Sequence, residues 1–309
     1  MTSNHFAFVI RRAVAASLAI ILCAATLPAQ DSLYVLQHYT KREALIAMRD
    51  GVKLFTAIYI PRDTTHRYPF MMNRTPYNVA PYGPGAYKTS LGPSSAFVHE
   101  GYIFVYQDVR GCWMSEGEYV NVTPHNAVKR SAYDVDESSD TYDTVDWLLK
   151  NIPHNNGRVG IWGISYPGFY AAAGMIDAHP ALVAVSPQAP IADWFAGDDF
   201  HHNGAFFLID AFDFFSGLGQ YRPSPTTIGP KGFDFGTPDA YRFFLSLGPL
   251  ANANERYFKG KIRFWNDLMA HGTYDEFWKA RDLLLHVKKI TPFDTSDYMV
   301  LDASTKRNL

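Results

Sequence analysis

The stretch from residue 157 to residue 176 holds the arrangement best suited to chemistry. Ser165 stands between an apolar run, residues 158–162, and an alanine-rich segment, residues 169–176. The first pattern predicts a buried strand and the second a helix. A serine on a sharp strand-to-helix turn projects its hydroxyl from the sheet, where a histidine can take its proton. The next backbone N–H, that of Tyr166, can then stabilise an oxyanion. The turn therefore predicts Ser165 as a nucleophile.

The glycines around Ser165 depart from the usual Gly-x-Ser-x-Gly pattern. Position 167 is a proline, and the second glycine is Gly168. This spacing alone is also typical of an ordinary glycine-rich turn. The strand and helix predicted on either side favour the nucleophile over the ordinary turn.

Further motifs stand in order around this turn, at residues 48–54, 74–77, 107–111 with 115–117, and 197–204. Together with the pattern Gly-x-Ser-Tyr-x-Gly, they resemble the S15-type serine hydrolases. That family contains X-Pro dipeptidyl-peptidases, cocaine esterase and the α-amino-acid ester hydrolases, and the last of these are the most similar. The resemblance extends from about residue 39 to about residue 290.

The resemblance implies roles for two more side chains. The phenol of Tyr77 would donate to the oxyanion beside the Tyr166 N–H. Asp199 would hold the α-ammonium group of a substrate through a charge-assisted hydrogen bond. We therefore expect the protein to cleave a small ester, an amide or a short peptide. The reaction would proceed through an acyl-enzyme on Ser165.

The cluster around Asp199 also permits a different interpretation. Asp198, Asp199, His201 and His202 could suggest a metal site. Two adjacent histidines cannot easily face one ion, so we expect no metal and no cofactor. Instead, Asp198, His201 and His202 are expected to form a local polar network.

The surrounding pattern predicts the elements that must position Ser165. Strands are expected at 52–60, 70–74, 101–107, 158–162 and 182–186, and helices at 138–152 and 169–176. This alternation predicts an α/β protein with a mostly parallel sheet covered on both faces, as in the α/β-hydrolase fold. A stretch dense in aromatic residues, 200–215, and helical stretches at 237–258 and 259–285 predict a helical cap that excludes water from the turn. We expect the core at 39–195 and the cap at 196–288.

A catalytic acid and histidine should follow the cap in such a hydrolase. The resemblance implies an apolar strand ending in an acid, then a histidine and a β-sandwich domain, but residues 289–309 carry no such strand. Asp294 only faintly resembles the acid, and His286 falls in a predicted cap helix. We expect the final strands and the β-sandwich to be missing, with an aberrant tail at 289–309. Two hypotheses stay open: a serine hydrolase impaired by truncation, and an inactive remnant that binds amines.

Two other candidates have simpler interpretations. Cys112 could be a nucleophile, but a small buried side chain is the favoured reading. Asp108 and Arg110 could form a catalytic pair, but a structural ion pair that braces the loop is favoured.

Composition sets broad limits on function. The 309 residues are 47% hydrophobic and 19% charged, enough for a sizeable core and about two domains. The net charge of −2 gives no reason to expect a nucleic-acid partner. The oligomeric state stays open, with a homo-oligomer compatible with the sequence.

The first 29 residues are typical of an export signal. Arg11 and Arg12 precede an apolar run, residues 13–27, that is short for a membrane span, and Ala29 offers a small residue for cleavage. An N-terminal anchor helix is the alternative. The signal predicts a secreted or periplasmic protein, free of the membrane once mature.

Cleavage of this segment is expected to give a mature chain that begins near Gln30. Cell fractionation followed by N-terminal sequencing measures this directly. A membrane-bound product that still carries Met1 contradicts export with cleavage.

Overall fold

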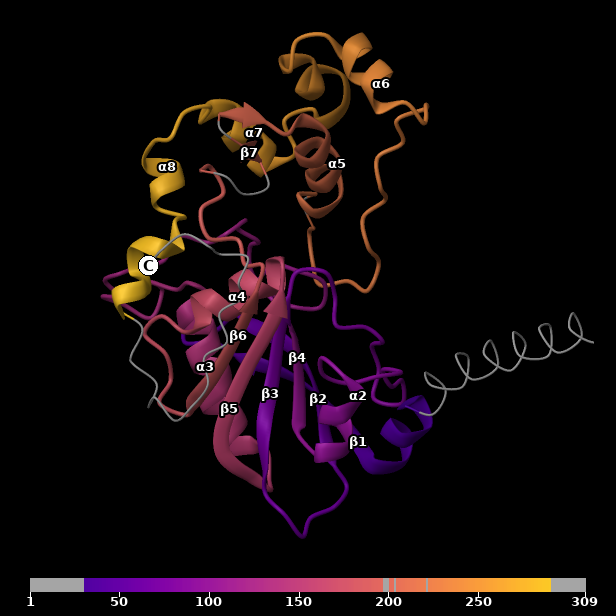
Figure 1. The fold of residues 1–309 in the computed structure, drawn as a ribbon, viewed down its shortest axis with the longest axis vertical. Helices are drawn as coiled ribbons and strands as arrows, with labels where there is room; N and C mark the ends of the chain where they lie inside the picture. Colours follow the sequence, from indigo (N-terminus) through magenta and orange to yellow (C-terminus); the bar gives the residue numbers. More distant parts are fainter. Residues whose placement is uncertain (1–30, 197–199, 203, 221, 290–309) are drawn as a thin grey trace, which may run out of the picture.

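The computed structural model describes residues 31–196, 200–202, 204–220 and 222–289. Six strands form one mixed sheet in the order β1-β2-β4-β3-β5-β6 (Figure 1). Strands β1 and β2 form an antiparallel hairpin, and β2 pairs antiparallel with β4, whereas β4, β3, β5 and β6 run parallel. The predicted α/β class and mostly parallel sheet are confirmed. The bounds are β1 Tyr39–Ala47, β2 Lys53–Pro61, β3 Tyr68–Thr75, β4 Ile103–Asp108, β5 Asn155–Ile164 and β6 Leu182–Gln188.

The two faces of the sheet bury different side chains, because successive residues of a strand point to opposite faces. In β4, Ile103 and Val105 join the cluster that includes residues of helices α3 and α4. Phe104 and Tyr106 join the cluster that includes residues of α2 and of the helical residues 31–38. The predicted cover on both faces is therefore present. These helices are α2 Ser95–Glu100, α3 Glu137–Asn151 and α4 Tyr166–Gly174.

Helix α3 begins at a capping box. The Asp136 side chain accepts from the Ser139 N–H at 2.8 Å, and the Ser139 hydroxyl accepts from the Asp136 N–H at 2.9 Å. Two backbone donors that lack intrahelical partners are thereby satisfied. The helix predicted at 138–152 is confirmed, displaced by one residue.

A buried arginine ties this helix to the sheet. Arg74, near the end of β3, is fully buried and donates to Gln107 Oε1 and Thr141 Oγ1, each at 2.9 Å. It also pairs with Glu137 at 3.0 Å. Strands β3 and β4 and helix α3 therefore meet at one charged group.

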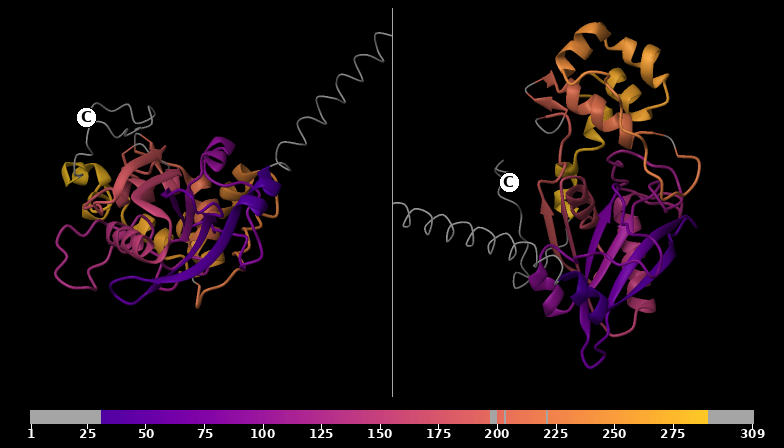
Figure 2. Two further views of the ribbon diagram at one scale, coloured as in Figure 1. Left: turned by 90° about the horizontal axis from the view of Figure 1, so that it is seen from below. Right: turned by 90° about the vertical axis from the view of Figure 1, so that its right-hand side faces the viewer.

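Beyond β6 the chain crosses the carboxyl ends of the parallel strands and forms a helical layer over them (Figures 1 and 2). The two stretches predicted to be helical, 237–258 and 259–285, each contain helices, but these are short and interrupted. Gly248 at φ 73° ends α6 directly before a proline, and Lys259 at φ 53° ends the next helical segment. The elements are β7 His201–His202, β8 Ala205–Phe206, α5 Leu208–Leu218, α6 Ala240–Leu247, a π-helix Ala253–Phe258, α7 Arg263–Ala270, α8 Glu276–Lys279 and a 3-10 helix Leu283–Lys289.

Aromatic rings form the interior of this cap. Phe212 of α5 is fully buried and lies within 5.6 Å, ring to ring, of Phe243, Phe258 and Trp265. The aromatic-rich sequence therefore packs mainly against itself. The predicted signal segment and the tail from residue 290 lie outside the described residues. Within the described part, no helix has the length and apolar character needed to cross a membrane.

Arg74→Ala is expected to lower the free energy of unfolding by about 3–5 kcal/mol, because it leaves Glu137 buried without its partner. Arg49→Ala is the matched control. Arg49 pairs with Asp143 at 2.8 Å in a partly exposed bridge, whose loss should cost about 1 kcal/mol or less. Urea denaturation of both variants compares the two costs. Equal losses would contradict a structural role for the Arg74 network.

Candidate active site

Ser165 occupies a strained turn between β5 and α4. Its backbone has φ 62° and ψ −122°, a region that non-glycine residues rarely adopt. Its N–H donates to Gln188 O of β6 at 3.0 Å, and its carbonyl accepts from Phe169 N–H at 3.0 Å. The predicted strand, sharp turn and helix are confirmed. The catalytic role of Ser165 stays a prediction.

Two glycines permit the close crossing at this turn. A Cβ atom on Gly163 would lie 2.1 Å from Pro167 O, and one on Gly168 would lie 2.5 Å from Gln188 O. The second glycine is needed at position 168 because that residue approaches the end of β6. Pro167 lies in the first turn of α4, where its missing N–H would have no helical partner. This explains why the sequence departs from the usual pattern.

Tyr166 contributes to the site in two ways. As the first residue of α4, its N–H has no partner within the helix and lies at the positive end of the helix dipole. Its buried side chain is fixed, since its hydroxyl donates to Asn121 Oδ1 and accepts from Val122 N–H, both at 3.0 Å. The backbone donor is thus held in place by the side chain.

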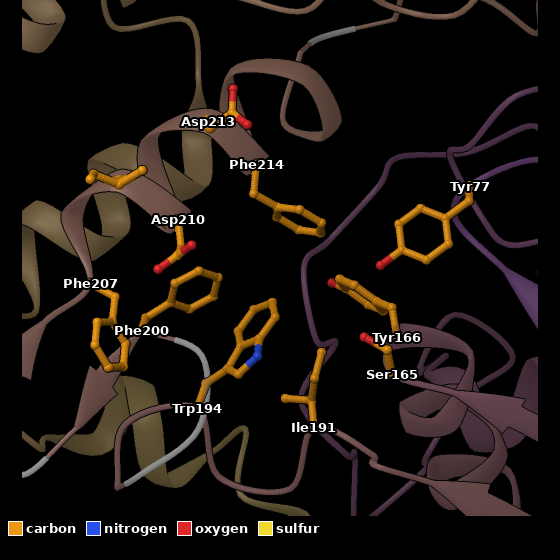
Figure 3. A pocket seen from close by; sticks show the side chains of 11 residues that line it. Tyr77, Ser165, Tyr166, Ile191, Trp194, Phe200, Phe207, Asp210, Asp213 and Phe214 are labelled. Atoms are coloured by element: carbon orange, nitrogen blue, oxygen red, sulfur yellow. The ribbon is translucent and has the colours of Figure 1, made fainter. Parts of the chain in front are cut away.

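Tyr77 lies beside this turn, on the loop that follows β3. Figure 3 shows its hydroxyl pointing toward Tyr166 and Ser165, and the two tyrosine rings meet edge to face at 6.3 Å. The loop is held on one side by Trp113, whose Nε1–H donates to Pro76 O at 2.8 Å. The structure therefore brings together the three residues predicted for the nucleophile and oxyanion site.

Asp108 holds the other side of this loop. Its carboxylate accepts from Val79 N–H at 3.0 Å, from the Tyr82 hydroxyl at 2.9 Å and from Met114 N–H at 3.2 Å. Burial raises the pKa of Asp108 from 3.8 to about 7, although these hydrogen bonds oppose the shift.

The predicted ion pair between Asp108 and Arg110 is wrong. The guanidinium of Arg110 instead pairs with Asp50 and with Asp140, each at 2.7 Å. Arg110 lies in the turn after β4, not in the strand with Asp108, and its partners come from segments that are distant in the chain.

A cavity of about 650 Å³ opens at Ser165 and reaches the cap helix α5. None of its described lining residues is a histidine, and no group of three candidate metal ligands occurs among the described residues. Its walls are mostly apolar and aromatic, as expected for a small-molecule site. The lining residues are Tyr77, Ser165, Tyr166, Ile191, Trp194, Phe200, Phe207, Ile209, Asp210, Asp213 and Phe214.

The other residues singled out in the sequence do not line this cavity among the described residues. Asp198, Asp199 and Asp294 lie outside the described residues. Among the described residues, the buried Nδ1 of His201 has no hydrogen-bond partner, and its ring stacks on Phe195 at 4.3 Å.

Three more candidate residues from the sequence lie at separate places in the structure: His202, His286 and Cys112. His202 is exposed and lies 5.9 Å, ring to ring, from Phe207. His286 lies in the 3-10 helix, its ring 4.6 Å from that of His125. Cys112 is buried as predicted, and burial raises the pKa of its thiol well above the usual value.

Sequence reasoning missed the cap residues that line the cavity. Asp210, Asp213 and Phe214 share one face of α5 at spacings of three and four residues, which was the available signal. Trp194 carried no signal, because it stands in an irregular segment.

Residues 50–293 match the family of X-Pro dipeptidyl-peptidases known as S15. The chain belongs to the S15 family. It is similar to the cocaine esterase of Rhodococcus sp. (strain MB1 Bresler), with 32% identity over 161 residues, which are 52% of this chain and 25% of the esterase.

Two solved structures of high similarity agree with this S15 assignment. An α-amino acid ester hydrolase superposes with a TM-score of 0.70 at 35% identity, and an aminopeptidase of a marine sediment Thaumarchaeota archaeon with 0.67 at 36%. Each match covers 80% of this chain and 40% of the other. The chain thus spans less than half the length of these relatives. It has the α/β-hydrolase-like fold of this family.

The stability of the folded chain is expected to fall as pH rises from about 4 to about 7, through Asp108. In this range the folded state keeps a proton on Asp108 that the unfolded state has lost, because the folded pKa is about 7 and the unfolded value near 3.8. Asp108→Asn should remove this component, which is on the order of a few kcal/mol. Urea denaturation at pH 5 and pH 8 measures it in both proteins. The same pH dependence in both would contradict the prediction.

Proposed function

We propose that this S15-family chain is a serine hydrolase that cleaves esters or amides through an acyl-enzyme on Ser165. The observation that carries the proposal is the common cavity at which Ser165, the Tyr77 hydroxyl and the start of α4 meet. A nucleophile and donors for an oxyanion in one apolar cavity are the elements of acyl transfer. Strand β5 and helix α4, on either side of Ser165, fix the position of its side chain relative to these donors.

In the proposed reaction, Ser165 Oγ attacks the acyl carbon and its proton passes to a general base. Electron density moves to the acyl oxygen, which the Tyr77 hydroxyl and the Tyr166 N–H stabilise. The tetrahedral intermediate collapses and releases the alcohol or amine, which takes up a proton. Water then attacks the acyl-enzyme and regenerates Ser165.

None of the described lining residues is a histidine, the usual general base of a serine hydrolase. A histidine base for the proposed reaction would come from outside these lining residues. The same observation favours a second candidate function, an inactive remnant that binds its ligand without turnover.

The proposed substrates carry a free amine near the acyl carbonyl. Support comes from the two relatives that are an α-amino acid ester hydrolase and an aminopeptidase. We assign the α-ammonium contact to Asp199, whose carboxylate matches that charge. An X-Pro dipeptide is the alternative substrate within the same class. The predicted signal segment supports action in the periplasm or outside the cell.

A fluorophosphonate probe is expected to label the wild type and not Ser165→Ala, since it reacts only with an activated serine. Tyr77→Phe should retain labelling but lower the kcat for p-nitrophenyl esters roughly 10²–10³-fold, the usual cost of one oxyanion donor. Equal labelling of wild type and Ser165→Ala would remove Ser165 from the reaction. No labelling of either protein, with ligand binding retained, would favour the inactive remnant.

A further inference from the structure

The phenol of Tyr166 is held by the loop that precedes α3. Its hydroxyl donates to Asn121 Oδ1 and accepts from the Val122 N–H, both at 3.0 Å. All three residues are buried, with exposed fractions of 1% for Tyr166 and Val122 and 6% for Asn121. Because the two hydrogen bonds are shielded from water, they fix the ring in one position. Asn121 and Val122 thus form a clamp on the Tyr166 ring.

Val122 adopts a backbone conformation that its side chain disfavours. Its φ is 41°, in the left-handed region, where a β-branched residue is a genuine outlier. Such strain persists only where surrounding contacts determine the conformation, and it is concentrated at functional sites. The N–H of this strained residue donates to the Tyr166 hydroxyl. The outlier therefore directs attention to Tyr166.

The loop that carries the clamp is anchored to the core. The hydroxyl of Thr123 donates to Glu137 Oε1, in the first turn of α3, at 3.0 Å. Glu137 in turn pairs with the buried Arg74 of β3 at 3.0 Å. The clamp therefore holds the Tyr166 ring from a segment that is fixed to α3 and β3 rather than to α4 itself.

The clamped ring relates to both proposed oxyanion donors. Tyr166 is the first residue of α4, so no hydrogen bond within the helix fixes its N–H. Rotation about its N–Cα bond would turn the N–H relative to the side chain, and a fixed side chain restricts that rotation. The Tyr77 ring meets the Tyr166 ring edge to face at 6.3 Å (Figure 3). A fixed Tyr166 ring therefore also limits the positions open to the Tyr77 phenol.

We propose that Asn121 and Val122 are positioning residues for the oxyanion site. The clamp holds the Tyr166 N–H and the Tyr77 hydroxyl where negative charge develops on the acyl oxygen. Neither clamp residue lines the cavity, so both act through the Tyr166 side chain. An interaction made only with the oxyanion changes the rate of the chemical step rather than substrate binding. The inference rests on the proposed function, since an oxyanion forms only when Ser165 attacks an acyl group.

Tyr166→Phe tests the clamp, because it removes the hydroxyl and keeps both the ring and the backbone N–H. The kcat for a p-nitrophenyl ester is expected to fall roughly tenfold, less than the 10²–10³-fold cost of losing one donor outright. KM should change by about twofold or less, since ground-state binding is untouched. Tyr170→Phe is the matched control and should keep the wild-type kcat. Tyr170 is fully buried and stacks on Tyr166 at 5.4 Å, but its hydroxyl has no hydrogen-bond partner among the described residues.

A second measurement follows the Tyr166 N–H without requiring turnover. In full-length protein labelled with ¹⁵N-tyrosine, the amide signal of Tyr166 is the one that Tyr166→Phe lacks. Asn121→Ala removes the acceptor of the phenol and should shift or broaden that signal in the ¹H–¹⁵N spectrum. Asn155→Ala is the control and should leave the signal in place. The Asn155 amide donates to Leu149 O and Ile152 O at the end of β5 remote from α4, so its removal also costs hydrogen bonds.

The outcomes separate this inference from the proposed function. An unchanged Tyr166 signal in Asn121→Ala overturns the inference, even where a fluorophosphonate labels Ser165. The same holds for equal kcat values in Tyr166→Phe and Tyr170→Phe, or for a signal displaced as far by Asn155→Ala. A signal displaced by Asn121→Ala and not by the control supports the clamp, even where Ser165 proves unreactive and the proposed function fails.

Discussion

The crossing of β5 and α4 at Ser165 is the constraint on which the site depends. The chain reverses there within a few residues, and only glycine fits at positions 163 and 168, where backbone oxygens lie 2.1 and 2.5 Å from the added Cβ. A backbone strained like that of Ser165 costs about 1–3 kcal/mol. Burial of α4 offsets this cost, since Phe169 and Tyr170 are fully buried against the sheet.

A set of polar contacts with the end of β4 holds the loop that carries Tyr77. Asp108 ends β4 next to β3 and holds Val79 and Tyr82, so the loop follows the sheet. Arg222, which follows α5, donates to Ser115 O at 2.7 Å and to Gly111 O at 3.2 Å. The cap is thereby tied to the segment that positions the loop.

The cavity combines apolar walls with localised charge. Aromatic rings from the core and the cap line the cavity at Ser165. The acidic residues of α5 lie at the cap side, away from the oxyanion donors.

The sequence by itself determined strands β2 to β6, helices α3 and α4, and the Ser165 turn, because each rests on local periodicity and on glycine and proline positions, whereas β1 was not predicted. The resemblance added Tyr77, which lies where it implied. The sequence did not reveal that Arg110 pairs with Asp50 and Asp140, or that Trp194 and Asp210 share a cavity with Ser165. These neighbours are distant in the chain or lie in irregular segments, and only the folding of the cap over the sheet brings them together. Local pattern fixes the elements, whereas the pairing of charges depends on packing between elements that no local pattern encodes.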